Sequence, residues 1–154
     1  GAYLESYFRF GGNPGAKIAR IRMLSQQMRG MKEKELKKAL SEIAQIESES
    51  DLKGVDEFTT ILLSEGLSNR GDFDDALARL IEYYQTHPLT VNQDRFRTKI
   101  QRNIASKMKG LVEGGDFIKV LETNEKYSQT WLKNVSRIDV DYFLGKAFEN
   151  GRLD

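Results

Sequence analysis

The sequence contains no cysteine, two prolines and a single histidine. Without cysteine it forms no disulfide bond and offers no thiolate as a nucleophile or metal ligand. The lone histidine, His87, cannot anchor a zinc site, and we predict neither a metal nor a cofactor. No apolar run approaches the ~18 residues that a membrane-spanning helix requires. We therefore expect no span, and localisation stays open because cytoplasm and periplasm both accept a chain without disulfides.

What the sequence does contain is typical of a globular chain: 154 residues, 39% of them hydrophobic and 31% charged. Its net charge of +1 hides an uneven distribution. Residues 1–41 hold nine basic and three acidic side chains, residues 42–82 hold three and eleven, and residues 83–154 hold twelve and nine. These blocks either neutralise one another after folding or form separate charged faces.

The pattern of apolar residues predicts an all-α fold. Apolar side chains recur at steps of three and four residues, and no stretch alternates for long enough to predict a sheet. A long helix is expected over about residues 90–113, followed by another that begins at Phe117. The helix that follows Lys32 is expected to bury Leu36, Leu40, Ile43 and Ala44.

The stretch "RGDFDDALARLIEYYQTHP" has the features of a complete helix with a defined start and end. Gly71 permits a sharp turn out of the preceding helix, and Pro88 prevents continuation. Aspartates crowd the first turn, where backbone N–H groups and the helix dipole favour carboxylates. We therefore interpret "RGD" as a turn and the aspartates as helix-start residues, rather than as an adhesion signal or a calcium site.

A second Gly-Asp-Phe occurs 44 residues later, beginning at Gly115. Residues 56–90 and 92–134 are therefore predicted to form two copies of one helical hairpin, and residues 138–154 a third, truncated copy. A single helical hairpin leaves an apolar face exposed, and stacking the next hairpin against it covers that face. The recurrence thus predicts an array of stacked hairpins.

The first copy resembles the tetratricopeptide repeat, a helix–turn–helix unit of ~34 residues. Leu63, Ala76 and Pro88 stand where that family prefers the same residues, whereas Thr60 and Ser64 replace its preferred Trp and Gly. In the third copy, the run "LGKAF" is similar to the family's Leu-Gly-x-x-aromatic run.

This resemblance implies an all-α fold of antiparallel helical hairpins, stacked as a short and degenerate α-solenoid. We expect a single helical-repeat domain over residues 1–154, with irregular helices over about residues 1–50 that match the repeat poorly. The chain begins with Gly1 rather than methionine, and its third copy stops within the repeat. We therefore expect it to be a piece of a longer protein.

In tetratricopeptide arrays, the first helices of successive hairpins line a groove that holds an extended peptide or a partner helix. The resemblance therefore implies a groove at Phe58, Ile61, Glu65, Asn69, Arg102, Ala105, Lys109, Tyr142 and Lys146. For the apolar members, packing between hairpins is the favoured alternative. Some members bind a C-terminal carboxylate through a Lys/Asn clamp, but Ile61 and Ala105 occupy positions where that clamp needs polar groups.

A basic segment lies between residues 95 and 109, with six basic and no acidic side chains. Arg95, Lys99 and Arg102 follow one face of the predicted helix. Such a face can bind phosphates or an acidic peptide. The more ordinary explanation is that the segment is solvated, or that it complements the acidic block of residues 42–82.

The sequence offers no recognisable set of nucleophile, base and orienting residue, so we do not expect an enzyme. We predict a non-catalytic protein–protein interaction or scaffold module with a protein or peptide partner. The first alternative is the binding of nucleic acid or another polyanion by Arg95, Lys99 and Arg102. The second is a structural spacer or self-association segment. The oligomeric state does not follow from the sequence.

Overall fold

The structure, a computed structural model, describes residues 14–51, 53–132 and 138–151, and within these ranges every regular element is helical. The predicted all-α class is therefore confirmed. The chain divides into two compact units, residues 1–79 and 80–154, and the division falls inside the helix α5 (Phe73–Thr86). The expectation of a single helical-repeat domain stays a prediction.

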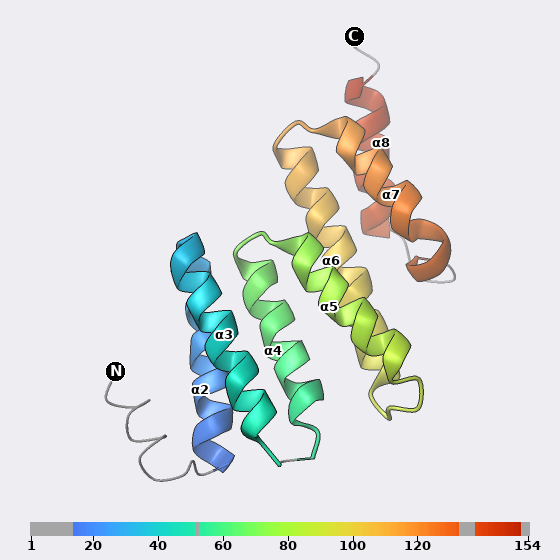
Figure 1. The fold of residues 1–154 in the computed structure, drawn as a ribbon. Helices are drawn as coiled ribbons and strands as arrows, with labels where there is room; N and C mark the ends of the chain where they lie inside the picture. Colours follow the sequence, from blue (N-terminus) through green and yellow to red (C-terminus); the bar gives the residue numbers. More distant parts are fainter. Residues whose placement is uncertain (1–13, 52, 133–137, 152–154) are drawn as a thin grey trace. The chain divides into compact units, whose positions relative to one another are not determined.

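The first unit contains α2 (Pro14–Gln27), the short 3-10 helix η1 (Met28–Gly30), α3 (Glu33–Glu49) and α4 (Val55–Asn69). As Figure 1 shows, α2 packs against both α3 and α4, and α3 also contacts α4. The expected irregular region before residue 50 thus contains two regular helices that pack against each other. The core of this unit consists of Ile21, Leu24, Met28, Leu36, Ala39, Ile43, Ile46, Val55, Leu63, Leu67 and Ala76.

One predicted core position in α3 is wrong. Ala44 is exposed, whereas Leu36 and Ile43 are buried and Leu40 is half-buried, as expected. The buried stripe continues through Ala39 and Ile46 instead. These residues lie three positions after Leu36 and three after Ile43, on the side of the helix that the core covers.

A glycine allows α2 and α4 to approach closely. A Cβ atom placed on Gly66 of α4 would lie 2.6 Å from the carbonyl oxygen of Ser25 in α2 and 2.8 Å from the sulfur of Met28. Both distances are shorter than van der Waals contact allows, so no side chain fits at Gly66 without separating the two helices. The absence of a side chain at residue 66 therefore sets how closely α4 packs on α2.

The two Gly-Asp-Phe sequences form the same turn. Gly71 and Gly115 both have positive φ angles, 90° and 76°. The N–H of each glycine donates to a carbonyl three residues earlier, and the N–H of each following aspartate donates to a carbonyl five residues earlier, at 2.9 Å in both turns. This is the Schellman motif that ends a helix at a left-handed glycine. Phe73 and Phe117 then begin the next helices, so the recurrence predicted from sequence corresponds to a repeated local structure.

The "RGD" tripeptide is built into the first unit. The Arg70 side chain is 12% exposed, and its Nε lies 2.6 Å from the Asp72 carboxylate. Its Nη1 donates to the carbonyl oxygens of Met28 and Met31, at 3.0 and 2.8 Å. Arg70 therefore ties the end of α4 to the backbone at both ends of η1, which confirms the interpretation of this tripeptide as part of a turn.

The second unit contains α6 (Gln93–Glu113), α7 (Phe117–Trp131) and α8 (Ile138–Gly151), and each of these helices packs against the other two. Figure 1 shows α7 and α8 beside each other near the C-terminus. The buried residues of α6 are those predicted for its apolar face, Phe96, Ile100, Ile104 and Met108. Aromatic rings join the end of α5 to α6, because Tyr83 stacks on His87 on one side and on Phe96 on the other, with centroid distances of 3.8 and 4.6 Å.

Candidate interaction face on α6 and α8

The basic side chains of α6 divide into two groups with different roles. Arg97 donates to the Tyr84 hydroxyl at 3.5 Å and to the carbonyl oxygen of Thr130, at the end of α7, at 3.4 Å. Its guanidinium therefore supports packing inside the second unit. Arg95 and Arg102 are exposed, and neither has an ion-pair partner among the described residues.

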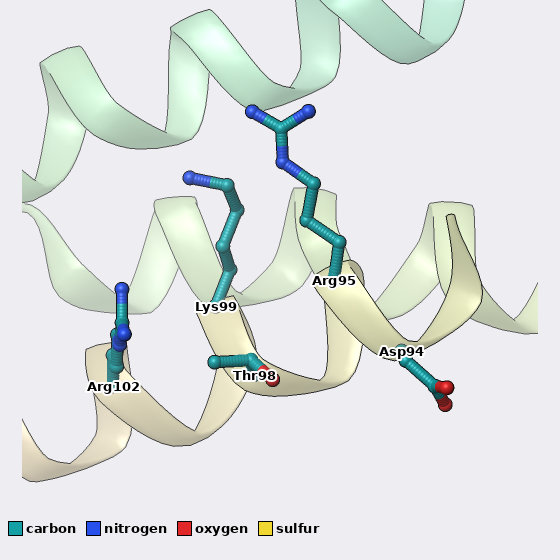
Figure 2. Close-up of a pocket in the computed structure, with 5 residues that line it drawn as sticks. All are labelled: Asp94, Arg95, Thr98, Lys99 and Arg102. Carbon is teal, nitrogen blue, oxygen red and sulfur yellow. The ribbon is translucent and has the colours of Figure 1, made fainter.

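A shallow hollow lies along the second group and is lined by Asp94, Arg95, Thr98, Lys99 and Arg102. Figure 2 shows Arg95 and Lys99 extending from α6 in the same direction, while the Asp94 carboxylate points away from them. All five residues belong to the first three turns of α6, and the three cations follow one another at steps of four and three residues. The structure therefore brings together Arg95, Lys99 and Arg102, as the sequence predicts.

The groove positions of the second unit lie on two helices that pack against each other. Arg102, Ala105 and Lys109 are on α6, and Tyr142 and Lys146 are on α8. Arg102, Lys109 and Tyr142 are exposed, with 60% of Tyr142 accessible to solvent. The Lys146 ammonium lies 5.7 Å from the centre of the Tyr142 ring, a distance at which a cation and an aromatic face attract.

The groove positions of the first unit are on α4, and they are of two kinds. Ile61 is buried, and Phe58 is half-buried with the Arg22 guanidinium 5.7 Å from the centre of its ring. Arg22 belongs to α2, so Phe58 takes part in the contact between α2 and α4. Glu65 and Asn69 are exposed. Ile61 is therefore part of the core and Phe58 part of the α2–α4 contact, and the groove implied at these positions stays a prediction.

Several carboxylates of the acidic block are paired inside the first unit. Glu42 receives two hydrogen bonds from the Arg20 guanidinium, at 2.9 and 3.1 Å, and both side chains are largely buried. The Asp75 carboxylate accepts from Arg79 at 3.2 Å within α5. Together with the Arg70–Asp72 pair, these contacts satisfy part of the acidic block without the basic segment.

Glu47, in the last turn of α3, is the titratable group with a resolved shift among the described residues. Burial raises the pKa of its carboxyl above the ordinary 4.5, and the Asp56 carboxylate adds to the rise, while the Thr59 hydroxyl and Arg79 act in the opposite direction. Thr59 is 2% exposed and its hydroxyl makes no hydrogen bond of normal geometry within the described part of the chain. It therefore gives the Glu47 carboxylate only a weak polar contact.

His87 occupies the end of α5. Its Nδ1 lies 3.1 Å from the carbonyl oxygen of Tyr83 and 2.9 Å from the Thr86 hydroxyl, and its ring stacks on Tyr83. These contacts give His87 a structural position at the helix end.

In residues 14–51, 53–132 and 138–151, no three His, Asp or Glu side chains are grouped so that they could hold a metal ion. Across the same ranges, no helix is long and apolar enough to cross a membrane.

Thr98 is the feature of this face that is absent from the prediction made on sequence. Thr98 lines the hollow between the cations, and its position three residues after Arg95 is the sequence signal for it. Arg97 is separated from Arg95 and Lys99 because a shift of two residues on a helix rotates a side chain by about 200°. Helical periodicity alone therefore separates Arg97 from Arg95, Lys99 and Arg102, as the sequence prediction did.

Comparison with known proteins assigns no relative to this chain. No family model matches it, and neither does a curated protein or a solved structure. The tetratricopeptide resemblance therefore stays a prediction, which depends on the residues that carry it and on the packing of the helices.

Proposed function

We propose that this chain is a non-catalytic interaction module that binds a peptide or partner helix on the face formed by α6 and α8. The observation that carries the proposal is the direct packing of these two helices, which present Arg102, Lys109 and Tyr142 to solvent. The Lys146 ammonium lies 5.7 Å from the centre of the exposed Tyr142 ring, and aromatic and arginine side chains are enriched at protein interfaces.

The order of packing supports a stacked-hairpin architecture. In the first unit α4 packs on α2, the helix two before it, and in the second unit α8 packs on α6 in the same way. This relation is what stacking one helical hairpin on the next produces. If the array is tetratricopeptide-like, α6 and α8 are the first helices of successive hairpins, and their shared face is where such arrays hold a ligand.

The charge of this face indicates the chemistry of the partner. Arg102, Lys109 and Lys146 are positive, and the described part of α6 carries no acid between residues 95 and 112. A partner segment with Asp or Glu side chains, and with an apolar group to place against Tyr142, is complementary to it. We therefore expect the bound segment to be acidic.

Affinity capture from a lysate, quantified by mass spectrometry, tests the proposal. The variant Arg102→Glu/Lys109→Glu reverses the charge of the proposed face. The matched control, Lys37→Glu/Lys38→Glu, makes the same change at two exposed positions of α3. Proteins that bind this face should be lost with the first variant and retained with the second. Unchanged capture of every protein by both variants would remove the face from consideration.

Nucleic-acid binding is the second candidate, because two exposed arginines of α6 have no ion-pair partner among the described residues. The net charge of +1 and the acidic block count against it, since a long polyanion would also meet repulsive carboxylates. Titration with single- and double-stranded oligonucleotides at low and moderate salt separates the two candidates. Phosphate contacts strengthen as salt falls, so the absence of binding at low salt would exclude nucleic acid.

A further inference from the structure

We infer that the hollow at the start of α6 binds a phosphoryl group, carried by a phosphorylated serine or threonine of the partner. The inference rests on the proposed function and specifies the ligand of one part of the same face. Four donor-bearing side chains meet at this hollow: two guanidinium groups, an ammonium group and a hydroxyl group, from Arg95, Arg102, Lys99 and Thr98.

The spacing of these residues concentrates their donors over a short distance. They occupy positions i, i+3, i+4 and i+7 of one helix, which place side chains on a single face. At a rise of ~1.5 Å per residue, the seven steps from Arg95 to Arg102 cover about 10 Å. A face of this length matches one compact anion, and Arg95 and Lys99 extend from it in the same direction (Figure 2).

The arginines are available for a ligand. Arg95 and Arg102 are exposed and have no ion pair within the described ranges, so binding an anion breaks no existing charge pair of theirs. The arginine of α6 that supports folding is Arg97, which contacts Tyr84 and Thr130. Substitution of Arg95 and Arg102 therefore changes the hollow without removing a packing contact that the structure shows.

Phosphate fits this donor set better than a carboxylate does. A phosphoserine carries a charge of about −1.5 to −2 and three acceptor oxygens, whereas an Asp or Glu side chain carries a single charge and two oxygens. A guanidinium fork matches two phosphate oxygens at once. The neighbouring hydroxyl of Thr98 supplies one further donor, and the nearest acid on this face, Asp94, points away.

A phosphorylated side chain also fits better than a nucleic-acid backbone. A nucleic acid needs a basic surface that continues along several phosphates. Beyond Arg102 the next exposed cation of α6 is Lys109, seven residues further along, and Arg97 is turned into the packing of the unit. A single phosphorylated residue needs only the cations that are present here. Arg102 belongs both to this hollow and to the proposed face, so it links the phosphoryl site to the surface proposed for the peptide.

The test uses the full 154-residue chain labelled with ¹⁵N, followed by NMR during titration. The probes are inorganic phosphate and a short alanine-rich peptide with one central phosphoserine, compared with the same peptide carrying serine or glutamate. We expect saturable shifts of the Arg95 and Arg102 Nε–H signals and of amides in the first turns of α6. The phosphoserine peptide should bind about tenfold more tightly than the glutamate peptide.

Three variants make the test specific. Arg95→Gln/Arg102→Gln should weaken binding of the phosphoserine peptide by about 10- to 100-fold, since two charge-assisted contacts are lost. Arg95→Lys/Arg102→Lys keeps the charge without the fork and should give an intermediate loss. Arg29→Gln removes an exposed guanidinium from η1 in the first unit and should leave binding unchanged.

Equal binding of the serine and phosphoserine peptides would overturn the inference. So would NMR chemical-shift changes of the same size in the parent chain and in the Arg95→Gln/Arg102→Gln variant. Tighter binding of a single-stranded oligonucleotide than of the phosphopeptide, at the same salt, would assign the face to nucleic acid instead. Phosphatase treatment of the lysate separates this inference from the proposed function. Capture that survives phosphatase but is lost with Arg102→Glu/Lys109→Glu refutes the phosphoryl site alone, whereas capture that neither treatment changes refutes both.

Discussion

The substitution Gly66→Ala probes the close contact between α2 and α4. The added methyl group would lie 2.6 Å from the Ser25 carbonyl oxygen and 2.8 Å from the Met28 sulfur. The oxygen belongs to the backbone of α2 and the sulfur to a fully buried side chain, so neither moves without shifting a helix or repacking the core. Over-packing of this kind costs about 1–3 kcal/mol.

A helix-propensity effect acts in the opposite direction. Replacing glycine with alanine in the middle of a helix stabilises it by up to ~1 kcal/mol. Because the clash involves backbone, we place its cost toward the upper end of its range, and we expect Gly66→Ala to reduce the free energy of unfolding by about 1–2 kcal/mol. Gly145 is the matched control, because it lies inside α8 and a Cβ there meets nothing within 4 Å. Gly145→Ala should therefore stabilise the protein by up to ~1 kcal/mol.

Urea denaturation followed by far-ultraviolet circular dichroism measures both changes. The two variants should shift the transition midpoint in opposite directions without a change in the denaturant slope. The single tryptophan, Trp131, reports on the second unit and provides an independent probe. If Gly66→Ala proved as stabilising as Gly145→Ala, the close approach of α2 and α4 would be refuted.

Three further substitutions test other contacts. Arg70→Ala should lower the free energy of unfolding by about 2–4 kcal/mol in urea denaturation, because the carbonyl groups of Met28 and Met31 lose a buried charged donor; a loss below ~0.5 kcal/mol would contradict this role. Gly115→Ala should cost about 1–2 kcal/mol by the same assay, because φ is 76° there, and an unchanged midpoint would argue against the left-handed turn. Burial raises the pKa of Glu47 in the folded protein above its ordinary value of 4.5. The protonated carboxyl therefore favours folding, fully so below pH 4.5, and this contribution to the free energy of unfolding is lost as the pH rises through the pKa of the folded protein. Glu47→Gln should thus be more stable than the parent chain at neutral pH in thermal denaturation, with the difference closing below about pH 4.5, and a gain that persists in acid would refute the assignment.

Local features of the fold could be predicted from the sequence because they depend on neighbouring residues. The turns at Gly71 and Gly115 follow from a glycine at a helix end with an aspartate after it, and the structure gives both the same hydrogen bonds. The start of α7 at Phe117 and its end at Trp131 follow from the same turn chemistry and from the apolar period. Such signals act over a few residues, which is why they can be recognised in one sequence.

Features that depend on contacts between distant residues could not be predicted in this way. The sequence around Gly66 does not show that a backbone carbonyl 41 positions earlier excludes its side chain. Arg70 appears in sequence as part of a turn, but its donation to Met28 and Met31 depends on how α4 meets η1. The expected burial of Ala44 is wrong because helical spacing allows two neighbouring stripes, and packing decides between them.

The candidate face was predicted in part. The grouping of Arg95, Lys99 and Arg102 follows from helical spacing, and the structure places them along one hollow. The sequence did not show which basic and acidic side chains are already paired in the folded chain. The pairing of Glu42 with Arg20 and the packing contact of Arg97 with Tyr84 both depend on tertiary structure. Those contacts leave Arg95 and Arg102 as the exposed arginines of α6.

Site-specific photo-crosslinking tests most directly whether the face of α6 and α8 holds a partner. A benzophenone-bearing phenylalanine replaces Tyr142, which is aromatic and 60% exposed, and in a second protein it replaces Ile118, which is 71% exposed at the start of α7. After irradiation in lysate, position 142 should form crosslinks to an acidic segment of a partner, and Arg102→Glu/Lys109→Glu should abolish them. Position 118 should not crosslink to the same segment. Equal crosslinking from both positions, or none from position 142, would contradict the proposed interaction face.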